Sequence, residues 1–262
     1  MIVDVHSHLN FPQFAKDLDE VVERAKNAGV ASILCSGVDQ KSNEKALELS
    51  KKYKIIKASL GVYPLDAVGL GHYDDSLREN KPLDVDGALK FIKKNKDNCI
   101  AIGEVGLDYS PETDSKEKEQ KDVFWKCISL AKKINKPLVV HTRKAEKDCL
   151  EILENSGLKR VVLHCFTGNL KLVKKAEDLG FYLSIPTIIV RLKHFQEVVN
   201  RVSINNLLTE TDAPYLSITK FGRSEPSHIT ETIKIISKIK KITDDETQKN
   251  IFSNYQKVFV KK

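Results

Sequence analysis

The sequence predicts an α/β protein of the (β/α)8 class, the fold also called a TIM barrel. Eight short apolar runs alternate with helical patterns along the whole chain, as in repeated βαβ units. Runs such as Val161-Val162-Leu163 are apolar throughout, which is typical of parallel strands buried on both faces. The length of 262 residues is close to the roughly 250 of one such barrel. We therefore expect residues 1–262 to form a single domain.

The eight apolar runs are the predicted strands. The sequence contains no GxGxxG or P-loop string, which argues against a nucleotide-binding open sheet and leaves the closed barrel favoured. The predicted strands cover residues 2–6, 32–37, 56–61, 99–104, 137–141, 161–164, 181–185 and 207–211.

Helical patterns fill the segments between these strands. The first runs over about residues 17–28 and ends before Gly29, and another runs over 169–179 and ends before Gly180, since glycine suits a left-handed C-cap. Residues 251–260 form the last part of an additional C-terminal helix. The predicted N-caps of three further helices are Ser42, Asp86 and Ser115.

The longest connection follows the third predicted strand and covers about residues 65–86. Its glycines and Pro82 are typical of a loop. Loops after the strands of this fold lie at the active-site end, so we expect this connection to cross the rim of the site. Its His72 is a weak candidate for substrate contact, and a surface position is the favoured alternative.

The composition indicates a cytoplasmic protein that does not associate with membranes. Hydrophobic residues make up 41% and charged residues 30% of the chain, no apolar stretch approaches the ~20 residues of a membrane span, and the N-terminus lacks a signal peptide. Five widely spaced cysteines without a CxxC pair are expected to be core residues. The net charge of +7 would attract anionic partners such as nucleic acid, although solvated lysine-rich helix faces are the favoured explanation.

Histidine and acidic residues stand where five of the predicted strands end. Because the C-terminal ends of the strands share one face of a (β/α)8 barrel, these residues converge on one site. A lone histidine at a strand end is more often structural, but four of the seven histidines stand at such ends beside two acids. The candidate metal ligands are His6, His8, Glu104, His141, His164 and Asp212.

The spacing within the first strand supports a metal site. Side chains two residues apart in a strand point the same way, so His6 and His8 can bind one ion from one face. Imidazole and carboxylate are ligands of zinc, manganese, iron and cobalt, and six of them exceed the needs of one catalytic zinc. We therefore expect two ions bridged by a carboxylate. Asp4 has the same parity and is the expected hydrogen-bond acceptor for a ligand histidine, with solvation at the barrel rim as the alternative.

At these positions the chain resembles the TatD family of metal-dependent hydrolases, within the amidohydrolase superfamily. The resemblance runs in order through nearly the whole chain, and an ordered set of motifs is far more specific than one HxH pair. The motifs are Asp4-Val5-His6-Ser7-His8-Leu9, Gly61-Val62-Tyr63-Pro64, Gly103-Glu104-Val105-Gly106-Leu107-Asp108-Tyr109, His141-Thr142-Arg143, His164-Cys165-Phe166-Thr167-Gly168, Glu210-Thr211-Asp212-Ala213-Pro214-Tyr215 and Glu225-Pro226.

The resemblance implies how the ligands divide between two ions. His6, His8, Glu104 and Asp212 would hold one ion, and Glu104 would bridge to a second ion held by His141 and His164. The sequence departs from the family pattern at two positions. Tyr63 stands where the motif Gly61-Val62-Tyr63-Pro64 usually has histidine, and Ser224 stands where an asparagine usually precedes the final glutamate. Both departures are expected to alter substrate contacts rather than the ligand set.

The resemblance also implies a deoxyribonuclease, including 3′-to-5′ exonuclease action on single-stranded DNA or RNA. Two divalent ions, zinc, manganese or magnesium, would activate water for attack on a phosphodiester. Glu104 and Asp212 would then be catalytic, with Asp212 also the candidate general base.

Substrate contacts are predicted with an alternative for each residue. Arg143 has the parity of His141 and could bind a phosphate, with a surface ion pair as the alternative. Arg223 and Lys220 are weaker phosphate candidates, and solvated charge is the simpler explanation for both. Tyr63 and Tyr109 follow strand ends and could stack on a base, with packing under the loops as the alternative for each.

Two other functions remain open at this point. A two-metal centre polarises a carbonyl as readily as a phosphoryl group, so an ester, lactone or amide, including a mischarged aminoacyl-tRNA, is an alternative substrate. A carboxylated lysine at the end of the fourth strand would favour phosphotriesterase-like relatives, but Glu104 stands there. A nucleic-acid-binding protein without turnover is the third possibility, and its expected feature, a broken ligand set, is absent from the sequence.

Overall fold

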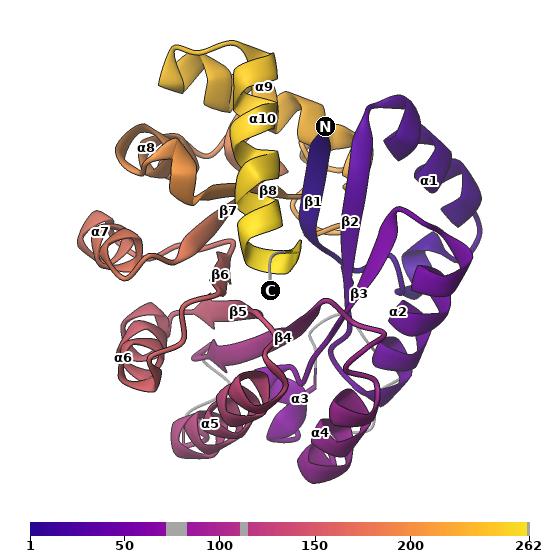
Figure 1. The fold of residues 1–262 in the computed structure, drawn as a ribbon, viewed down its shortest axis with the longest axis vertical. Coiled ribbons are helices and arrows are strands. Elements are labelled where there is room, and N and C mark those ends of the chain that lie inside the picture. Colours follow the sequence, from indigo (N-terminus) through magenta and orange to yellow (C-terminus); the bar gives the residue numbers. More distant parts are fainter. Residues whose placement is uncertain (72–82, 111–114, 261–262) are drawn as a thin grey trace.

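The computed structural model describes residues 1–71, 83–110 and 115–260. Within them, eight parallel strands follow one another in sequence order and form a ring with helices on its outside (Figure 1). The strands are β1 (Ile2–Ser7), β2 (Val30–Ser36), β3 (Ile56–Leu60), β4 (Ala101–Asp108), β5 (Leu138–Arg143), β6 (Val161–His164), β7 (Tyr182–Pro186) and β8 (Leu207–Glu210). The predicted (β/α)8 barrel is confirmed.

The ring closes where β8 meets β1. The Thr209 hydroxyl donates to the Val3 carbonyl at 2.6 Å. Just beyond the end of β8, the Asp212 amide donates to the His6 carbonyl at 2.9 Å, and the His8 amide donates to the Ala213 carbonyl at 2.6 Å. The first and last strands are therefore joined at the level where the candidate ligands lie.

Helices separate the strands and pack on the outside of the ring. The longer helices bury apolar residues against the barrel, as amphipathic helices do. The helices are α1 (Leu18–Asn27), α2 (Gln40–Lys52), α3 (Pro64–Ala67), α4 (Val85–Lys94), α5 (Glu117–Ile134), α6 (Glu146–Ser156), α7 (Leu170–Asp178), α8 (Lys193–Arg201), α9 (Ile229–Lys240) and α10 (Asp244–Tyr255).

The C-terminal helix α10 covers the barrel end where the strands begin. The Tyr255 hydroxyl is 2.9 Å from that of Ser32 near the start of β2, and the Asn254 amide donates to the carbonyl of Leu207, where β8 starts. The N-terminal ammonium group donates to Gln248 on α10. The opposite end, where the strands finish, is therefore the end that remains for a site.

The helix ends agree with the sequence in part. Gly29 and Gly180 follow α1 and α7 with positive φ values of 82° and 76°, as predicted. The three predicted N-caps are wrong. Asp39 caps α2 and accepts from the Ser42 amide in a capping box, Asp84 caps α4, and Lys116 precedes α5. In α2 and α4 an aspartate two or three residues upstream reaches the free amides first, so the helix starts earlier.

Three remaining expectations concern burial and the long connection. Cys35, Cys99, Cys127 and Cys149 are buried as free thiols, and Cys165 is half-buried. No described helix combines the length and apolarity that a bilayer crossing requires. Residues 64–67 of the long connection form α3, whereas His72 lies outside the described residues.

Candidate metal centre

The six predicted ligands meet at the end of the barrel where the strands finish. His6 and His8 come from β1 and the residue after it, Glu104 from β4, His141 from β5, and His164 from β6, and Asp212 follows β8 by two residues. Parallel strands point their carboxyl ends to one face, so residues more than two hundred positions apart come together. The candidate ligands are buried, except that the Asp212 side chain remains 15% exposed.

One group of four donor atoms surrounds a single point beside β1. The Nε2 atoms of His6 and His8 lie 3.1 Å apart, and they lie 3.4 and 3.3 Å from Glu104 Oε2. Asp212 Oδ1 lies 3.4 Å from the first and 3.5 Å from the second. All four atoms therefore face the same small volume.

A second group of three donor atoms uses the other oxygen of the same glutamate. Glu104 Oε1 lies 2.8 Å from His141 Nδ1 and 3.1 Å from His164 Nε2, and these two nitrogens are 3.2 Å apart. Glu104 thus presents one carboxylate oxygen to each group. This is the arrangement of a carboxylate that bridges two cations.

The spacing of these atoms fits bound metal ions. Tetrahedral bonds of about 2.0–2.1 Å place neighbouring ligand atoms about 3.3–3.4 Å apart. The first group spans 3.1–3.5 Å and the second 2.8–3.2 Å. Two pairs of imidazole nitrogens also face each other, one between His6 and His8 and one between His141 and His164. Only one proton fits between the two nitrogens of a pair, whereas a metal ion can bind both. The donor set and its geometry therefore fit two divalent ions.

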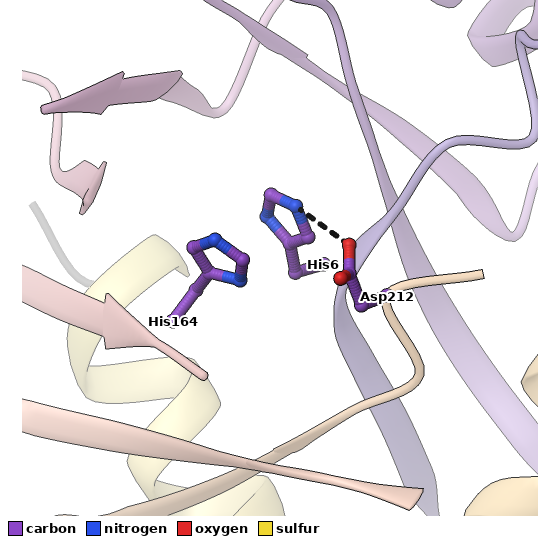
Figure 2. Close-up of side chains that lie close together, drawn as sticks. All are labelled: His6, His164 and Asp212. Carbon is purple, nitrogen blue, oxygen red and sulfur yellow. Dashed lines mark ion pairs between the residues drawn. The ribbon is translucent and has the colours of Figure 1, made fainter. Parts of the chain in front are cut away.

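The two groups are in contact through stacked imidazoles. The rings of His6 and His164 lie with their centroids 4.0 Å apart and their planes 17° apart. Figure 2 shows these two rings and Asp212, whose carboxylate approaches His6. The stacking helps to hold both rings in place, and with them the donor nitrogens.

The orientation of His141 is set by Asp108, whose role the sequence did not reveal. The His141 Nε2 atom lies 3.0 Å from Asp108 Oδ2, which also accepts the Tyr63 hydroxyl at 3.1 Å. The other Asp108 oxygen accepts the Ser110 amide at 2.9 Å. Proton donation from Nε2 to this carboxylate leaves Nδ1 free to face Glu104, the usual arrangement of a ligand histidine and its acidic partner. Asp108 lies in the motif Gly103–Tyr109, and that position was the available signal.

The other candidate ligand histidines also have polar groups near the ring nitrogens that face away from the centre. The Ser36 carbonyl accepts from His8 Nδ1 at 3.1 Å, and the Ser36 hydroxyl lies 3.3 Å from His6 Nδ1. Glu210 Oε1 lies 3.7 Å from His164 Nδ1, and the same oxygen accepts the Cys165 amide. Glu210 is the second acidic group that the sequence analysis did not assign.

Asp4 corrects one prediction. Its carboxylate accepts the Thr211 hydroxyl at 2.6 Å, the Thr211 amide at 3.0 Å and the His6 amide at 3.3 Å. The carboxylate therefore bonds the backbone of His6 and not its ring, because Asp4 points across the seam towards β8. It is also fully buried, which excludes solvation at the rim, and burial raises its pKa to about 8 against the opposing effect of the Thr211 bonds. Asp4 therefore joins the segment that carries His6 to the segment that carries Asp212.

Two glycines allow the backbones around the centre to approach closely. A Cβ on Gly61 would lie 2.2 Å from the Glu104 amide nitrogen. A Cβ on Gly106, whose φ is +146°, would lie 2.0 Å from the His141 carbonyl oxygen. Such contacts exclude any larger residue without movement of β4 or β5. The two glycines therefore help to place Glu104 and His141.

The electrostatics of the site favour ionised acids. Burial works against the charge of Glu104, but the nearby His164 and His6 hold its pKa well below the usual range. The pKa of Asp212 is likewise lowered, since the bonds with His6 and His8 outweigh its burial. Burial alone would lower the pKa of His8, yet the bonds to Asp212 and Glu104 raise it to about 9. The two ionised carboxylates therefore favour positive charge on the groups around them, and a bound cation would supply that charge.

Comparison with known proteins decides the family. The family model described as "TatD related DNase" matches residues 3–260. The chain belongs to the TatD family. It is 36% identical over 264 residues to the human protein named "Deoxyribonuclease TATDN3", with 99% of this chain and 95% of the relative covered. It is 34% identical to "Uncharacterized metal-dependent hydrolase YabD" of Bacillus subtilis, with 99% of both covered.

A solved structure agrees with the fold of this TatD protein. The crystal structure of YJJV, a TatD homologue from Escherichia coli, superposes with a TM-score of 0.86 at 22% identity and covers 100% of this chain and 98% of that chain. At that identity the likeness shows the fold. The family and its curated relatives establish a metal-dependent hydrolase of a DNase family.

The predicted substrate contacts of this TatD protein divide into two kinds. Base stacking by Tyr63 is wrong: the ring is 2% exposed, and its edge packs against His141. Phosphate binding by Arg223 is also wrong, because its guanidinium is held by Asp17 and Glu225 and lies over the ring of Phe14. In both cases the structure supplies partners that are distant in the sequence.

Two predicted contacts remain predictions. The Arg143 side chain is 53% exposed at the end of β5, with its Nη1 atom 3.9 Å from Asp108. Tyr109 is half-buried, and its hydroxyl donates to Asp148 at 3.0 Å. Ser224, the second departure from the family pattern, is buried with its hydroxyl 3.3 Å from that of Thr187. It is thus part of the packing under the loop after β8.

Proposed function

We propose that this TatD protein hydrolyses phosphodiester bonds of single-stranded DNA or RNA from the 3′ end, with two divalent ions bound at the centre. The observation that carries the proposal is the position of the Glu104 carboxylate. Each of its two oxygens faces a different group of donor atoms. A pair of cations suits a phosphodiester because it can neutralise charge on both the attacking and the leaving oxygen. The 3′-to-5′ direction is supported by the family resemblance.

The proposed ligands fall into the two groups that the distances between their donor atoms define. His6, His8, Glu104 and Asp212 would hold the first ion, and Glu104, His141 and His164 the second. The mixture of imidazole and carboxylate suits zinc or manganese, and magnesium is the third candidate. When bound, such ions make water more acidic and polarise the phosphoryl group.

Asp212 is the proposed general base. Its carboxylate lies at the opening of the centre, since it is the most exposed of the six ligand side chains at 15%. Its lowered pKa keeps the carboxylate unprotonated at neutral pH but also makes it a weak base, so it would accept a proton only from water that bound ions have made more acidic. Oδ1 faces the histidines, which leaves Oδ2 for the proton.

Arg143 is the proposed phosphate contact. It follows the ligand His141 by two residues on β5, so its backbone position lies at the rim of the centre. Its side chain is half exposed, and its ion pair with Asp108 is long at 3.9 Å. A guanidinium in this position can bind two phosphate oxygens at once.

The test is a cleavage assay on protein reconstituted with zinc, manganese or magnesium. Single-stranded DNA labelled at its 5′ end should be shortened stepwise from the 3′ end, and a 3′-terminal phosphorothioate should slow the first step. Ester and aminoacyl-tRNA substrates are assayed in parallel. Metal-dependent ester cleavage without cleavage of DNA or RNA would reject the proposed substrate.

Variants connect the activity to the centre. Glu104→Ala should abolish turnover while circular dichroism shows an intact fold. The matched control is Glu119→Ala, which removes an exposed glutamate whose partner is Lys116 on the outer surface. Full activity in the Glu104 variant would place the reaction elsewhere.

A further inference from the structure

The loop after β8 ends in an exposed aromatic residue that has no role in the centre. Phe221 is 92% exposed, more than any other large hydrophobic residue in the described part of the chain. We propose that Phe221 and Lys220 bind a base and a phosphate of the single-stranded nucleic acid where it leaves the active site. This rests on the proposed function only for the chemical class of the substrate.

The loop is held firmly on both sides of its tip. Before the tip, the Leu216 carbonyl accepts the Thr187 hydroxyl at 2.8 Å, and the Ser217 carbonyl accepts from Arg191 at 3.4 Å. After the tip, Arg223 is paired with Asp17 on the far side of the barrel seam. The exposure of Phe221 therefore belongs to an anchored loop that presents the ring to solvent.

The same loop starts at the metal centre. It leaves β8 through Asp212, a proposed ligand, and the Tyr215 ring lies with its centroid 6.3 Å from that of His8 at 68°. The Phe11 ring stacks on His8 with centroids 4.6 Å apart and also meets the Tyr215 ring, with centroids 6.4 Å apart. Aromatic rings thus stand at the base of the loop, beside the centre, and again at its tip. A nucleic-acid strand that follows the loop away from the metal centre would pass from the rings at its base to the ring at its tip.

The charges around the tip match a polyanion with bases. Lys220 Nζ lies 5.3 Å from the centre of the Phe221 ring, so a cation and an aromatic face are presented together. Arg191 and Lys193, on the neighbouring segment after β7, are also exposed. An aromatic platform flanked by cations is the usual means of holding a single strand without sequence preference, because every base has a stacking face. An apolar protein partner would not require the cations.

The test uses the single tryptophan of the chain, Trp125 on α5. In a Trp125→Phe/Phe221→Trp double variant, the only indole stands at the loop tip. Titration with an oligothymidylate of about ten nucleotides, in EDTA so that no strand is cut, should quench its fluorescence. By fluorescence anisotropy, Phe221→Ala should raise the Kd of the oligonucleotide about fivefold or more, the lower end of one stacked base, and Phe221→Tyr should restore it. Trp125→Ala, which removes the exposed ring on α5, is the matched control and should leave Kd unchanged.

Four results would overturn the inference. They are no binding of the oligonucleotide by wild-type protein, an unchanged Kd in Phe221→Ala, equal quenching by a polyphosphate that lacks bases, and quenching by anionic phospholipid vesicles but not by the oligonucleotide. Because binding is measured without turnover, the assay separates this inference from the proposed function. Loss of cleavage with Phe221-dependent binding intact would reject the function alone, whereas cleavage with no effect of Phe221 would reject the inference alone.

Discussion

Replacing Asp108 by asparagine should weaken one of the two proposed ions and spare the other. Asp108 accepts from His141 Nε2, from the Tyr63 hydroxyl and from the Ser110 amide, so both of its oxygens are used as acceptors. Burial opposes its charge, but the bond with His141 lowers its pKa to about 2, so the acceptor is a carboxylate. The substitution keeps the shape of the side chain and removes one acceptor and the charge.

Neither orientation of the new amide satisfies the site. With its oxygen towards His141, the amino group faces the Ser110 N–H, and two donors oppose each other. With the amide turned over, the amino group faces His141 Nε2, and the imidazole proton moves to Nδ1, which lies 2.8 Å from Glu104 Oε1. The nitrogen proposed as a ligand is then protonated. Loss of such an acidic partner costs about 10–100-fold in metal affinity, which corresponds to about 1.4–2.7 kcal/mol.

Isothermal titration with zinc measures this effect. We expect wild-type protein to bind two ions, and Asp108→Asn to weaken the ion held by His141 and His164 while the ion beside His6 keeps its affinity. Asp148→Asn, which changes an aspartate bonded to the Tyr109 hydroxyl, is the matched control. Two unchanged dissociation constants in Asp108→Asn would refute the orientation argument. An equal effect in Asp148→Asn would show that the loss of a negative charge, and not the orientation of His141, weakens metal binding.

Three further predictions test the surroundings of the centre. Arg143→Ala should raise KM for an oligonucleotide about tenfold, since one charged hydrogen bond is lost. Arg223→Ala should lower the unfolding free energy by about 1 kcal/mol and raise KM less than Arg143→Ala does, because Arg223 anchors a loop and does not itself bind a phosphate. The reverse pattern in steady-state kinetics and urea denaturation would contradict both assignments. Gly106→Ala should destabilise the fold by about 2–5 kcal/mol in urea, because it adds strain and a backbone clash, and Gly157→Ala, with positive φ but open space, should cost less. In metal-free protein the raised pKa of His8, about 9, contributes stability that is complete below its ordinary value of 6.5 and is lost as the pH rises to about 9. The Tm of metal-free protein should therefore fall over that window, and a flat profile would count against the raised pKa.

The sequence was sufficient for the strands and for the convergence of the ligands. Apolar runs mark the strands, and the fold itself carries their ends to one face, so the positions of His6 and Asp212 follow without knowledge of any side-chain contact. The start of a helix depends on finer detail. Asp39 and Ser42 are both good capping residues three positions apart, and the structure uses both, with the aspartate as the cap.

Partners distant in the sequence account for the errors. Arg223 is paired with Asp17, 206 positions away, and no local pattern distinguishes this pair from a free cation at the rim. Tyr63 follows a strand end as predicted, but its ring turns inward to Asp108, 45 positions later. Asp4 points to β8 for the same reason. The direction in which a side chain points at a strand end depends on neighbouring residues that come together only in the closed barrel.

The seam between β1 and β8 gives the first proposed ion a second consequence. His6 and His8 are synthesised before Asp212, and most of the eight-stranded barrel lies between them in the sequence. An ion bound by all three residues would join the first and last strands, and it would bind only once the barrel has closed. A nascent chain that stops before residue 212 should lack this site, so high-affinity uptake at this position should begin only when the eighth repeat has emerged from the ribosome and docked against the first.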